Sequence, residues 1–167
     1  MILSKKEIFK KIEIKEIEII PFNKENVQAC SIDLRLGGYF RKPLKNNKNL
    51  KLDSDYNEFY YKTVKKNKFI LKPGERILAV TLERIKLNET ICGFLEGKSS
   101  IARNGLMIDL NSNLVQPGVF NNQVLEIINF SKNNFVLEKG KKVCQIFFEE
   151  LKGKESYKGK FKFQQKP

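Results

Sequence analysis

Short runs of alternating apolar and polar residues dominate the chain, and their β-branched and aromatic content is typical of strands. The runs are residues 32–36, 69–71, 76–82, 91–95, 124–128, 135–137 and 143–149. Glycine, proline and asparagine between the runs predict turns, because these residues supply the backbone angles that reversals need. Turns are expected at Gly37 and Gly38, Pro73 and Gly74, Pro117 and Gly118, Asn121 and Asn122, and Gly140. Many short strands at this spacing predict a mainly β protein, either a sandwich or a barrel.

The N-terminal residues follow a helical pattern instead. Ile8, Phe9 and Ile12 recur at the spacing of one helix face. Ser4 stands three residues before Glu7, as in a capping box. We therefore expect a short N-terminal helix that begins after Ser4.

Three other segments interrupt the series of short strands. In residues 11–20, isoleucines alternate with charged residues, which predicts a strand or an extended lead into one. Residues 41–68 are rich in lysine, asparagine and aspartate, and are expected to form an excursion on the surface. Residues 152–167 are basic and carry aromatic and amide side chains. They form either a frayed terminus or an arm that orders over a bound phosphate ligand.

The length of 167 residues suits one domain, and 41% hydrophobic residues suffice for a single core. We expect residues 1–167 to form one domain, with residues 152–167 as its C-terminal arm. No run of about twenty apolar residues occurs, and residues 1–10 lack the continuous apolar stretch of a signal peptide. The protein is therefore expected to be cytoplasmic and to have no membrane partner.

A strong positive charge marks the composition. The 32 lysines and arginines exceed the 19 acidic residues and give a formal charge of +13. Nucleic acid, an anionic membrane surface and a nucleoside triphosphate all fit this charge, which by itself does not choose between them. Most lysines stand beside hydrophobic residues, as on the solvated faces of strands and helices.

The absence of histidine narrows the chemistry. The commonest general base and the usual nitrogen ligand for metals are missing, so catalysis must use carboxylates, lysines, hydroxyls or backbone groups. Zinc-dependent nucleobase deaminases are excluded, because they need a His or Cys ligand near a Glu and a CxxC pair downstream. Cys30, Cys92 and Cys144 are widely spaced and form no such pair. We therefore expect neither a disulfide framework nor a cysteine zinc site.

Residues 95–106, with the sequence LEGKSSIARNGL, carry the densest chemistry of the chain. A glycine permits close approach of a ligand, the serines offer donors, and Lys98 and Arg103 supply charge suited to phosphate oxygens. The stretch is not a P-loop, because that motif needs a glycine five residues before Gly97, where Cys92 stands. From the residues alone, a phosphate site and a helix N-terminus capped by serine are equal alternatives.

Several segments, in the same order along the chain, resemble the trimeric deoxynucleotide hydrolases that include dCTP deaminases and dUTPases. They are residues 1–4 (MILS), 29–37 (ACSIDLRLG), 97–106 (GKSSIARNGL), 115–129 with VQPG and VLEIIN, 137–148 with LEKG and QIFF, and 157–160 (YKGK). One fragment would be weak evidence, whereas a shared order and spacing over nearly the whole chain is specific. The chain resembles the dCTP deaminases more than the dUTPases.

The resemblance implies a distorted β-barrel or jelly-roll subunit of the dUTPase type, assembled as a homotrimer with active sites between subunits. It implies dCTP as substrate, with Mg²⁺ on the triphosphate and no metal ligand from the protein. By the same resemblance, the triphosphate would be bound by Lys98, Ser99, Ser100 and Arg103, with Ile101 and Ala102 between them. The deoxyribose would face Gln116, and the base would face Val124, Leu125 and Glu126. The nucleotide would be covered by Tyr157, Lys160 and Gln164.

Deaminases and dUTPases of this family place different carboxylates beside the attacking water. The dUTPase aspartate lies at the position of Gln116, whose amide is not a base in the accessible pH range. The deaminase glutamate matches Glu126, which would activate water against C4 of cytosine and return the proton to the departing ammonia. Arg103 or Ser99 would orient that water. Without the resemblance, Glu126 would be taken for an outward-facing strand residue.

Departures from the family pattern keep two alternatives open. Asp109, Asn111 and Ser112 stand where many deaminases carry histidine and then threonine and alanine. One alternative is a dUTP diphosphatase, or a bifunctional enzyme that forms dUMP, with Asp33 or Asp109 replacing the missing aspartate. The other is a nucleotide- or nucleic-acid-binding protein with a vestigial catalytic site. We expect deamination of dCTP to dUTP and ammonia, and no nucleic-acid partner.

Overall fold

The computed structural model describes residues 1–44, 49, 51, 53–108 and 112–167. Its helices are α1 (Lys5–Glu13) and α2 (Ser99–Ala102), with 3-10 helices η1 (Lys24–Asn26) and η2 (Tyr56–Phe59). Its strands are β1 (Ile17–Ile20), β2 (Ile32–Arg41), β3 (Val64–Lys65), β4 (Lys68–Leu71), β5 (Arg76–Leu87), β6 (Ile91–Gly97), β7 (Leu106–Ile108), β8 (Leu114–Val115), β9 (Phe120–Asn129), β10 (Phe135–Glu138) and β11 (Lys142–Glu150).

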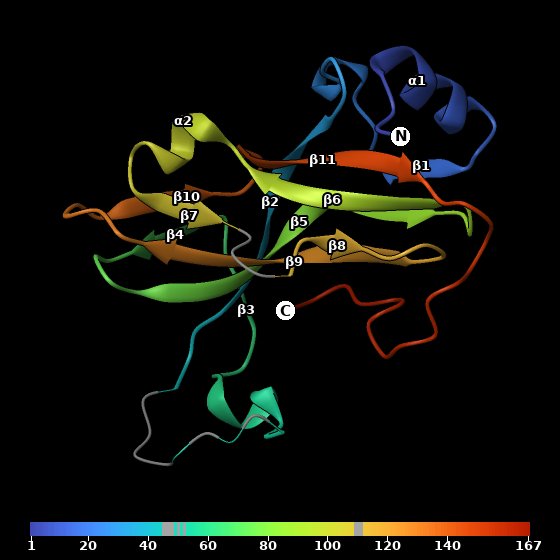
Figure 1. Cartoon of the computed structure of the whole chain (residues 1–167). Coiled ribbons are helices and arrows are strands. Elements are labelled where there is room, and N and C mark those ends of the chain that lie inside the picture. The colour runs from blue at the N-terminus through green and yellow to red at the C-terminus, as the bar shows by residue number, and fades with distance from the viewer. Residues whose placement is uncertain (45–48, 50, 52, 109–111) are drawn as a thin grey trace.

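The strands build a curled antiparallel sheet around the core (Figure 1). Neighbouring strands follow the order β7–β9–β5–β2–β11–β6–β8, with β1 paired to β5 and β3 to β2, whereas β10 and β4 form a separate ladder. Most neighbouring strands of the sheet are not consecutive in sequence, so the sheet joins segments that lie far apart along the chain. Inward side chains such as Leu34, Leu125 and Ile146 are fully buried. The predicted mainly β fold is confirmed.

Helix α1 confirms the predicted short N-terminal helix. The Ser4 Oγ accepts a hydrogen bond from the Glu7 N–H at 3.5 Å, as the cap pattern indicates. Ile8 lies on the inner face of the helix and is fully buried. Residues 11–20 are divided, since α1 covers their start and β1 their end.

The turn predicted at Gly37 and Gly38 is wrong, because both glycines lie inside β2. A Cβ on Gly37 would meet the Val80 carbonyl oxygen of β5 at 2.8 Å. The register of β2 against β5 shifts between Leu36 and Phe40, and the two backbones approach closely at this bulge. Glycine is needed here for close approach between strands and not for a reversal.

The turn predicted at Asn121 and Asn122 is also wrong, because both asparagines lie inside β9. The Asn122 Nδ2 donates to the carbonyl oxygens of Thr81 and Glu83, at 3.0 and 3.2 Å. These carbonyls belong to the stretch of β5 where its register against β9 shifts. The asparagine therefore satisfies backbone groups that the bulge leaves outside the ladder.

The turns predicted at Gly74, Gly118 and Gly140 agree with the structure. Gly74, Gly118 and Gly140 have positive φ at predicted turns. In the excursion of residues 41–68, η2 lies apart from the sheet in Figure 1. Residues 152–167, red in Figure 1, contain no helix or strand and run back along the molecule. Within the described ranges, no helix has the length and apolar content to cross a membrane.

Candidate active site

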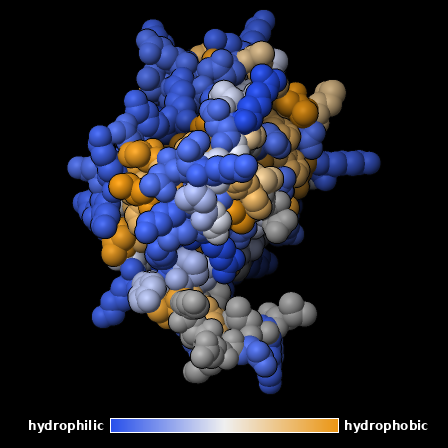
Figure 2. All heavy atoms as spheres, turned by 90° about the vertical axis from the view of Figure 1, so that its left-hand side faces the viewer, coloured by the Kyte–Doolittle hydropathy of each residue, from blue (hydrophilic) through white to orange (hydrophobic). Residues whose placement is uncertain are grey.

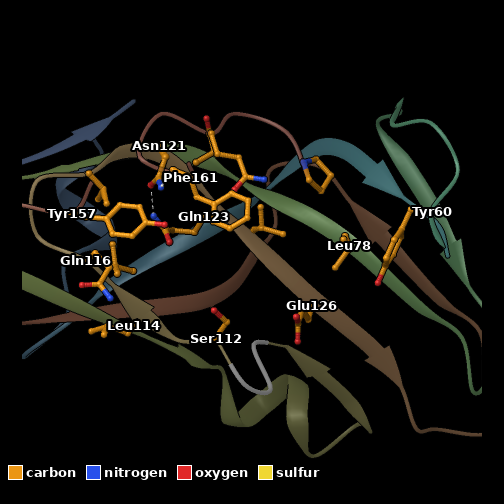
Figure 3. A pocket seen from close by; sticks show the side chains of 16 residues that line it. Tyr60, Leu78, Ser112, Leu114, Gln116, Asn121, Gln123, Glu126, Tyr157 and Phe161 are labelled. Atoms are coloured by element: carbon orange, nitrogen blue, oxygen red, sulfur yellow. Dashed lines mark hydrogen bonds between the residues drawn. The ribbon is translucent and has the colours of Figure 1, made fainter. Parts of the chain in front are cut away.

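A cavity of about 410 Å³, which we call the arm cavity, lies between β8, β9 and the C-terminal arm (Figure 3). Its volume is typical of small-molecule sites. Its lining combines apolar side chains, several carboxamides and, among the described residues, a single acidic side chain. The lining residues are Tyr60, Leu78, Ser112, Leu114, Val115, Gln116, Val119, Asn121, Asn122, Gln123, Val124, Glu126, Tyr157, Phe161, Gln164 and Pro167.

The acidic side chain is Glu126. Burial alternates along β9, so that Leu125 and Ile127 are fully buried whereas Val124 and Glu126 are partly exposed. Successive side chains of a strand point to opposite faces, which places Glu126 on the face away from the core. Figure 3 shows its carboxylate in the cavity. The prediction that Leu125 faces the base is wrong, because its side chain lies in the core and its backbone pairs with Ala79 of β5.

Gln116 and the arm enclose the other end of the arm cavity. Gln116 lies in the turn between β8 and β9, on the same side of the cavity as Tyr157 in Figure 3. The Tyr157 N–H donates to the Pro117 carbonyl oxygen at 2.9 Å and ties the arm to this turn. Gln164 also lines the cavity, whereas Lys160 is exposed and lies outside the lining.

One edge of β9 is shared between the arm and β7. The N–H groups of Phe120 and Asn122 donate to two carbonyl oxygens of the arm, both at 2.9 Å. Strand β7 pairs with residues 127–129 of the same strand. Alternate N–H groups of a strand point to the same edge, so the backbone N–H of Val124 points to the edge that the arm and β7 share and lies between these two segments. A ligand at this position meets a backbone donor and acceptor directly.

A second cavity of about 470 Å³, the serine cavity, lies beside α2. Of the predicted phosphate residues, Lys98, Ser99, Ile101 and Ala102 line it, whereas Ser100 and Arg103 are exposed outside it. The N-cap of α2 is Lys98 and makes no side-chain cap bond, so the interpretation of the serines as a helix cap is wrong. The hydroxyls and the Arg103 guanidinium bond to no other described residue, which leaves them open to a ligand.

A buried carboxylate on β2 holds Lys98 in place. The Lys98 Nζ lies 2.5 Å from Asp33 Oδ1, and the Lys142 Nζ lies 3.1 Å from Oδ2. Burial by itself would raise the pKa of Asp33, but the hydrogen bonds and charges of the two lysines outweigh burial and hold that pKa below its ordinary value. Asp33 is therefore an anionic support for Lys98 and a poor base for activating water.

The predicted site residues thus divide between two cavities of one chain. The arm cavity is lined by Gln116, Val124, Glu126, Tyr157 and Gln164. The serine cavity is lined by Lys98, Ser99, Ile101 and Ala102. Four predicted residues lie outside both linings: Ser100, Arg103, Leu125 and Lys160. Ser112, one of the departures from the family pattern, lines the arm cavity. Asp109 and Asn111 lie outside the described residues.

Tyr60, Asn121 and Gln123 line the arm cavity without having been predicted from the sequence. Asn121 and Gln123 occupy buried positions of β9, where strand alternation predicts apolar side chains. The carboxamides on this buried face, Asn121, Gln123 and Asn129, are the signal, because buried amides need partners. Tyr60 comes from the excursion, where no sequence pattern links it to β9.

Comparison with a known structure identifies the fold. The crystal structure of 2'-deoxycytidine 5'-triphosphate deaminase from Agrobacterium tumefaciens matches with a TM-score of 0.68 over 88% of this chain, at 19% identity. The present chain spans 47% of that chain. The likeness shows a shared fold.

Sequence comparison then gives the family. A family model described as dCTP deaminase-like matches residues 2–151. The dCTP deaminase of Buchnera aphidicola subsp. Baizongia pistaciae is 40% identical over 164 residues, covering 90% of this chain and 84% of that protein. The protein of Methanosphaera stadtmanae named dCTP deaminase, dUMP-forming, is 38% identical over 159 residues, covering 90% and 79%. The chain belongs to the dCTP deaminase family, and the resemblance is confirmed.

Proposed function

We propose that the protein deaminates dCTP hydrolytically to dUTP and ammonia. The position of Glu126 carries this proposal, because Glu126 is the one acidic side chain among the described residues that line the arm cavity. Its carboxylate accepts no hydrogen bond from the rest of the described chain and is open to a water molecule. The residue that dUTP hydrolysis would use as base is Gln116, an amide that does not take up protons near neutral pH.

In this mechanism Glu126 acts first as general base and then as general acid. Its carboxylate takes a proton from water while the water oxygen bonds to C4 of cytosine and the C4=N3 double bond opens onto N3. Glu126 then returns the proton to the exocyclic amino group, the electron pair on N3 reforms the double bond to C4, and the bond from C4 to the amino nitrogen breaks to release ammonia. The remaining hydroxyl proton moves to N3, which gives uracil. One water and one dCTP are consumed, and the carboxylate is regenerated. Ser99 or Arg103 orients the water by donating to its oxygen.

The arm cavity supplies groups for the base and the sugar. The backbone N–H and C=O of Val124, on the edge of β9 between the arm and β7, offer a donor and an acceptor to the edge of the base. The Gln116 amide both donates and accepts, so it suits the sugar 3′-hydroxyl. Tyr157 and Gln164 of the arm cover the nucleotide.

The turn around α2 supplies groups for the triphosphate. Lys98, Ser99, Ser100 and Arg103 combine two cations with two hydroxyls, a set that suits phosphate oxygens. The described residues contain no group of three or more His, Cys, Asp or Glu that could hold a metal ion. We place Mg²⁺ on the triphosphate oxygens, as part of the substrate.

A homotrimer with sites between subunits reconciles these assignments. In one chain, Val124 and Glu126 line the arm cavity, whereas Lys98 and Ser99 line the serine cavity. In such a trimer, the arm cavity of one subunit and α2 of a neighbour would bind one nucleotide together. Met107 and Phe130 are 41% and 64% exposed. Figure 2 shows apolar side chains among hydrophilic ones on the side that carries α2 and β7, which supports contacts between subunits there.

The names of relatives favour dUMP formation as a second candidate. The Methanosphaera protein and one from Nanoarchaeum equitans, 37% identical over 164 residues, are both named dUMP-forming. Such an enzyme would also hydrolyse the bond between the α- and β-phosphates and release pyrophosphate. We place this reaction second, because Gln116 is no base and Asp33 is paired with two lysines.

Incubation of the purified protein with Mg²⁺ and dCTP tests both candidates when ammonia, pyrophosphate and nucleotides are assayed together. We expect equal amounts of ammonia and dUTP, and a rate lower by about 10²–10⁴-fold for Glu126→Gln. Glu25→Gln, at an exposed position outside both cavities, is the matched control and should keep the wild-type rate. Pyrophosphate with dUMP would favour the second candidate. Wild-type turnover by Glu126→Gln would overturn the role of this residue, and binding of dCTP without any turnover would indicate a nucleotide-binding protein.

A further inference from the structure

The C-terminal arm is docked along β9 by backbone hydrogen bonds. The Phe120 N–H donates to the Lys162 carbonyl oxygen and the Asn122 N–H to that of Gln164, both at 2.9 Å. Both partners advance by two residues between the bonds, so the arm runs parallel to β9 over this stretch. Asn121 lies between the two bonded residues of β9.

Asn121 adds a side-chain bond to the arm. Its Nδ2 donates to the Phe161 carbonyl oxygen at 2.8 Å. Its Oδ1 accepts from Gln123 Nε2 at 2.5 Å, the contact drawn as a dashed line in Figure 3. The oxygen and nitrogen of a carboxamide diverge from one carbon, and a flip of the amide exchanges their positions. The hydrogen bond from Gln123 to Oδ1 therefore fixes the Asn121 amide in the orientation in which Nδ2 faces the arm.

Gln123 is itself fixed to β5. Its backbone N–H donates to Thr81 Oγ1 at 3.0 Å, and Thr81 Oγ1 donates to the Glu83 carbonyl oxygen at 2.7 Å. Gln123 and Thr81 are 9% and 1% exposed. Hydrogen bonds thus connect the bulge of β5 to the arm through the interior of the protein.

The burial of these two carboxamides supports a role in holding the arm. Farther along the same face of β9, Leu125 and Ile127 are apolar and fully buried. A buried amide without a partner is costly, so Asn121 and Gln123 are tolerated on this face when their bonds are made. One of the partners is the arm itself.

We propose that Asn121 and Gln123 are positioning residues that latch the arm onto β9 and thereby set how tightly the arm cavity holds a nucleotide. The latch acts through Phe161 and Gln164, which belong to the arm and line that cavity. The link to nucleotide binding rests on the proposed function, whereas the latch itself rests on the hydrogen bonds.

Asn121→Asp tests the latch, because it keeps the shape of the side chain, removes the Nδ2 donor and sets a carboxylate against the Phe161 carbonyl oxygen. Trypsin cleavage at the lysines of residues 158–162 reports whether the arm is docked. We expect about tenfold faster cleavage, as for the loss of one hydrogen bond of ordinary net strength. Gln123→Met, which removes the bond that orients Asn121, should have a smaller effect. Asn134→Asp makes the same change at an exposed position and should be cleaved at the wild-type rate.

The kinetics of dCTP conversion separate a loosened arm from a damaged fold. A loosened arm should raise KM about tenfold with little change in kcat, whereas a damaged fold lowers kcat and exposes lysines throughout the chain. Equal cleavage of Asn121→Asp and Asn134→Asp would overturn the latch. Faster arm cleavage with an unchanged KM would overturn its link to the nucleotide. If the wild-type protein neither binds nor converts dCTP, the proposed function fails, while the cleavage rates still decide the latch.

Discussion

Replacement of Asp33 by asparagine should lower the free energy of unfolding by about 3 kcal/mol at pH 7. The carboxylate accepts hydrogen bonds from Lys98, Lys142 and Gln28, at 2.5, 3.1 and 3.1 Å, and is 4% exposed. A hydrogen bond to a charged group contributes about 1.5–3 kcal/mol. The Lys142 side chain is 41% exposed, so solvent screening reduces its share and Lys98 accounts for most of the loss.

The size of this loss should depend on pH. In the folded chain the pKa of Asp33 lies below its ordinary value, so its stabilisation is fully present above the unfolded pKa of about 3.9. The stabilisation disappears as the pH falls through the folded pKa, because a protonated carboxyl no longer attracts the two ammonium groups. The difference between the wild type and Asp33→Asn should therefore shrink below about pH 4.

Urea unfolding at matched protein concentrations, from neutral to acidic pH, measures both quantities. Asp53→Asn makes the same chemical change at an exposed position and should alter the free energy of unfolding by less than about 0.5 kcal/mol. Equal unfolding midpoints for the two variants, or a difference that persists undiminished in acid, would refute the reasoning. Asp33→Asn should also weaken dCTP binding, because Lys98 loses the partner that positions it.

Three further substitutions probe the packing around the site. Gly37→Ala should destabilise the protein by about 2 kcal/mol in thermal or urea unfolding, since its Cβ would meet a carbonyl oxygen of β5 at 2.8 Å. Leu125→Ala should lower the free energy of unfolding by about 2–5 kcal/mol, because it empties a buried position. Val124→Ala, on the opposite face of β9, should lower it less, and equal losses for the two variants would contradict the alternation in β9. Gly118→Ala should accelerate trypsin cleavage of the arm, because this glycine has a φ of 74° and an added Cβ would collide with Ser156. Unchanged cleavage would show that the arm does not depend on this contact.

Local patterns in the sequence were enough to predict the mainly β fold and the N-terminal helix. Alternation and β-branched residues act between neighbours in the chain, and the Ser4 cap acts within a single turn. The failures at Gly37 and at Asn122 have one cause. A glycine or an asparagine looks the same in sequence whether it reverses the chain or accommodates a neighbouring strand. The neighbour in both cases is the bulged part of β5, which lies far away in the sequence.

For the site, the order of motifs along the sequence determined the family and made Glu126 the candidate base. Period-two alternation alone places Glu126 and Leu125 on opposite faces of one strand, although it does not say which face is open.

Only the tertiary structure decided which groups meet. It packed the arm against β9, gave Asn121 and Gln123 their partners, and set Lys98 on the buried Asp33. It also divided the predicted residues between two cavities, a separation that no spacing along the chain reveals. These contacts depend on strand order and on the path of the arm, which bring together residues with no local relation in sequence.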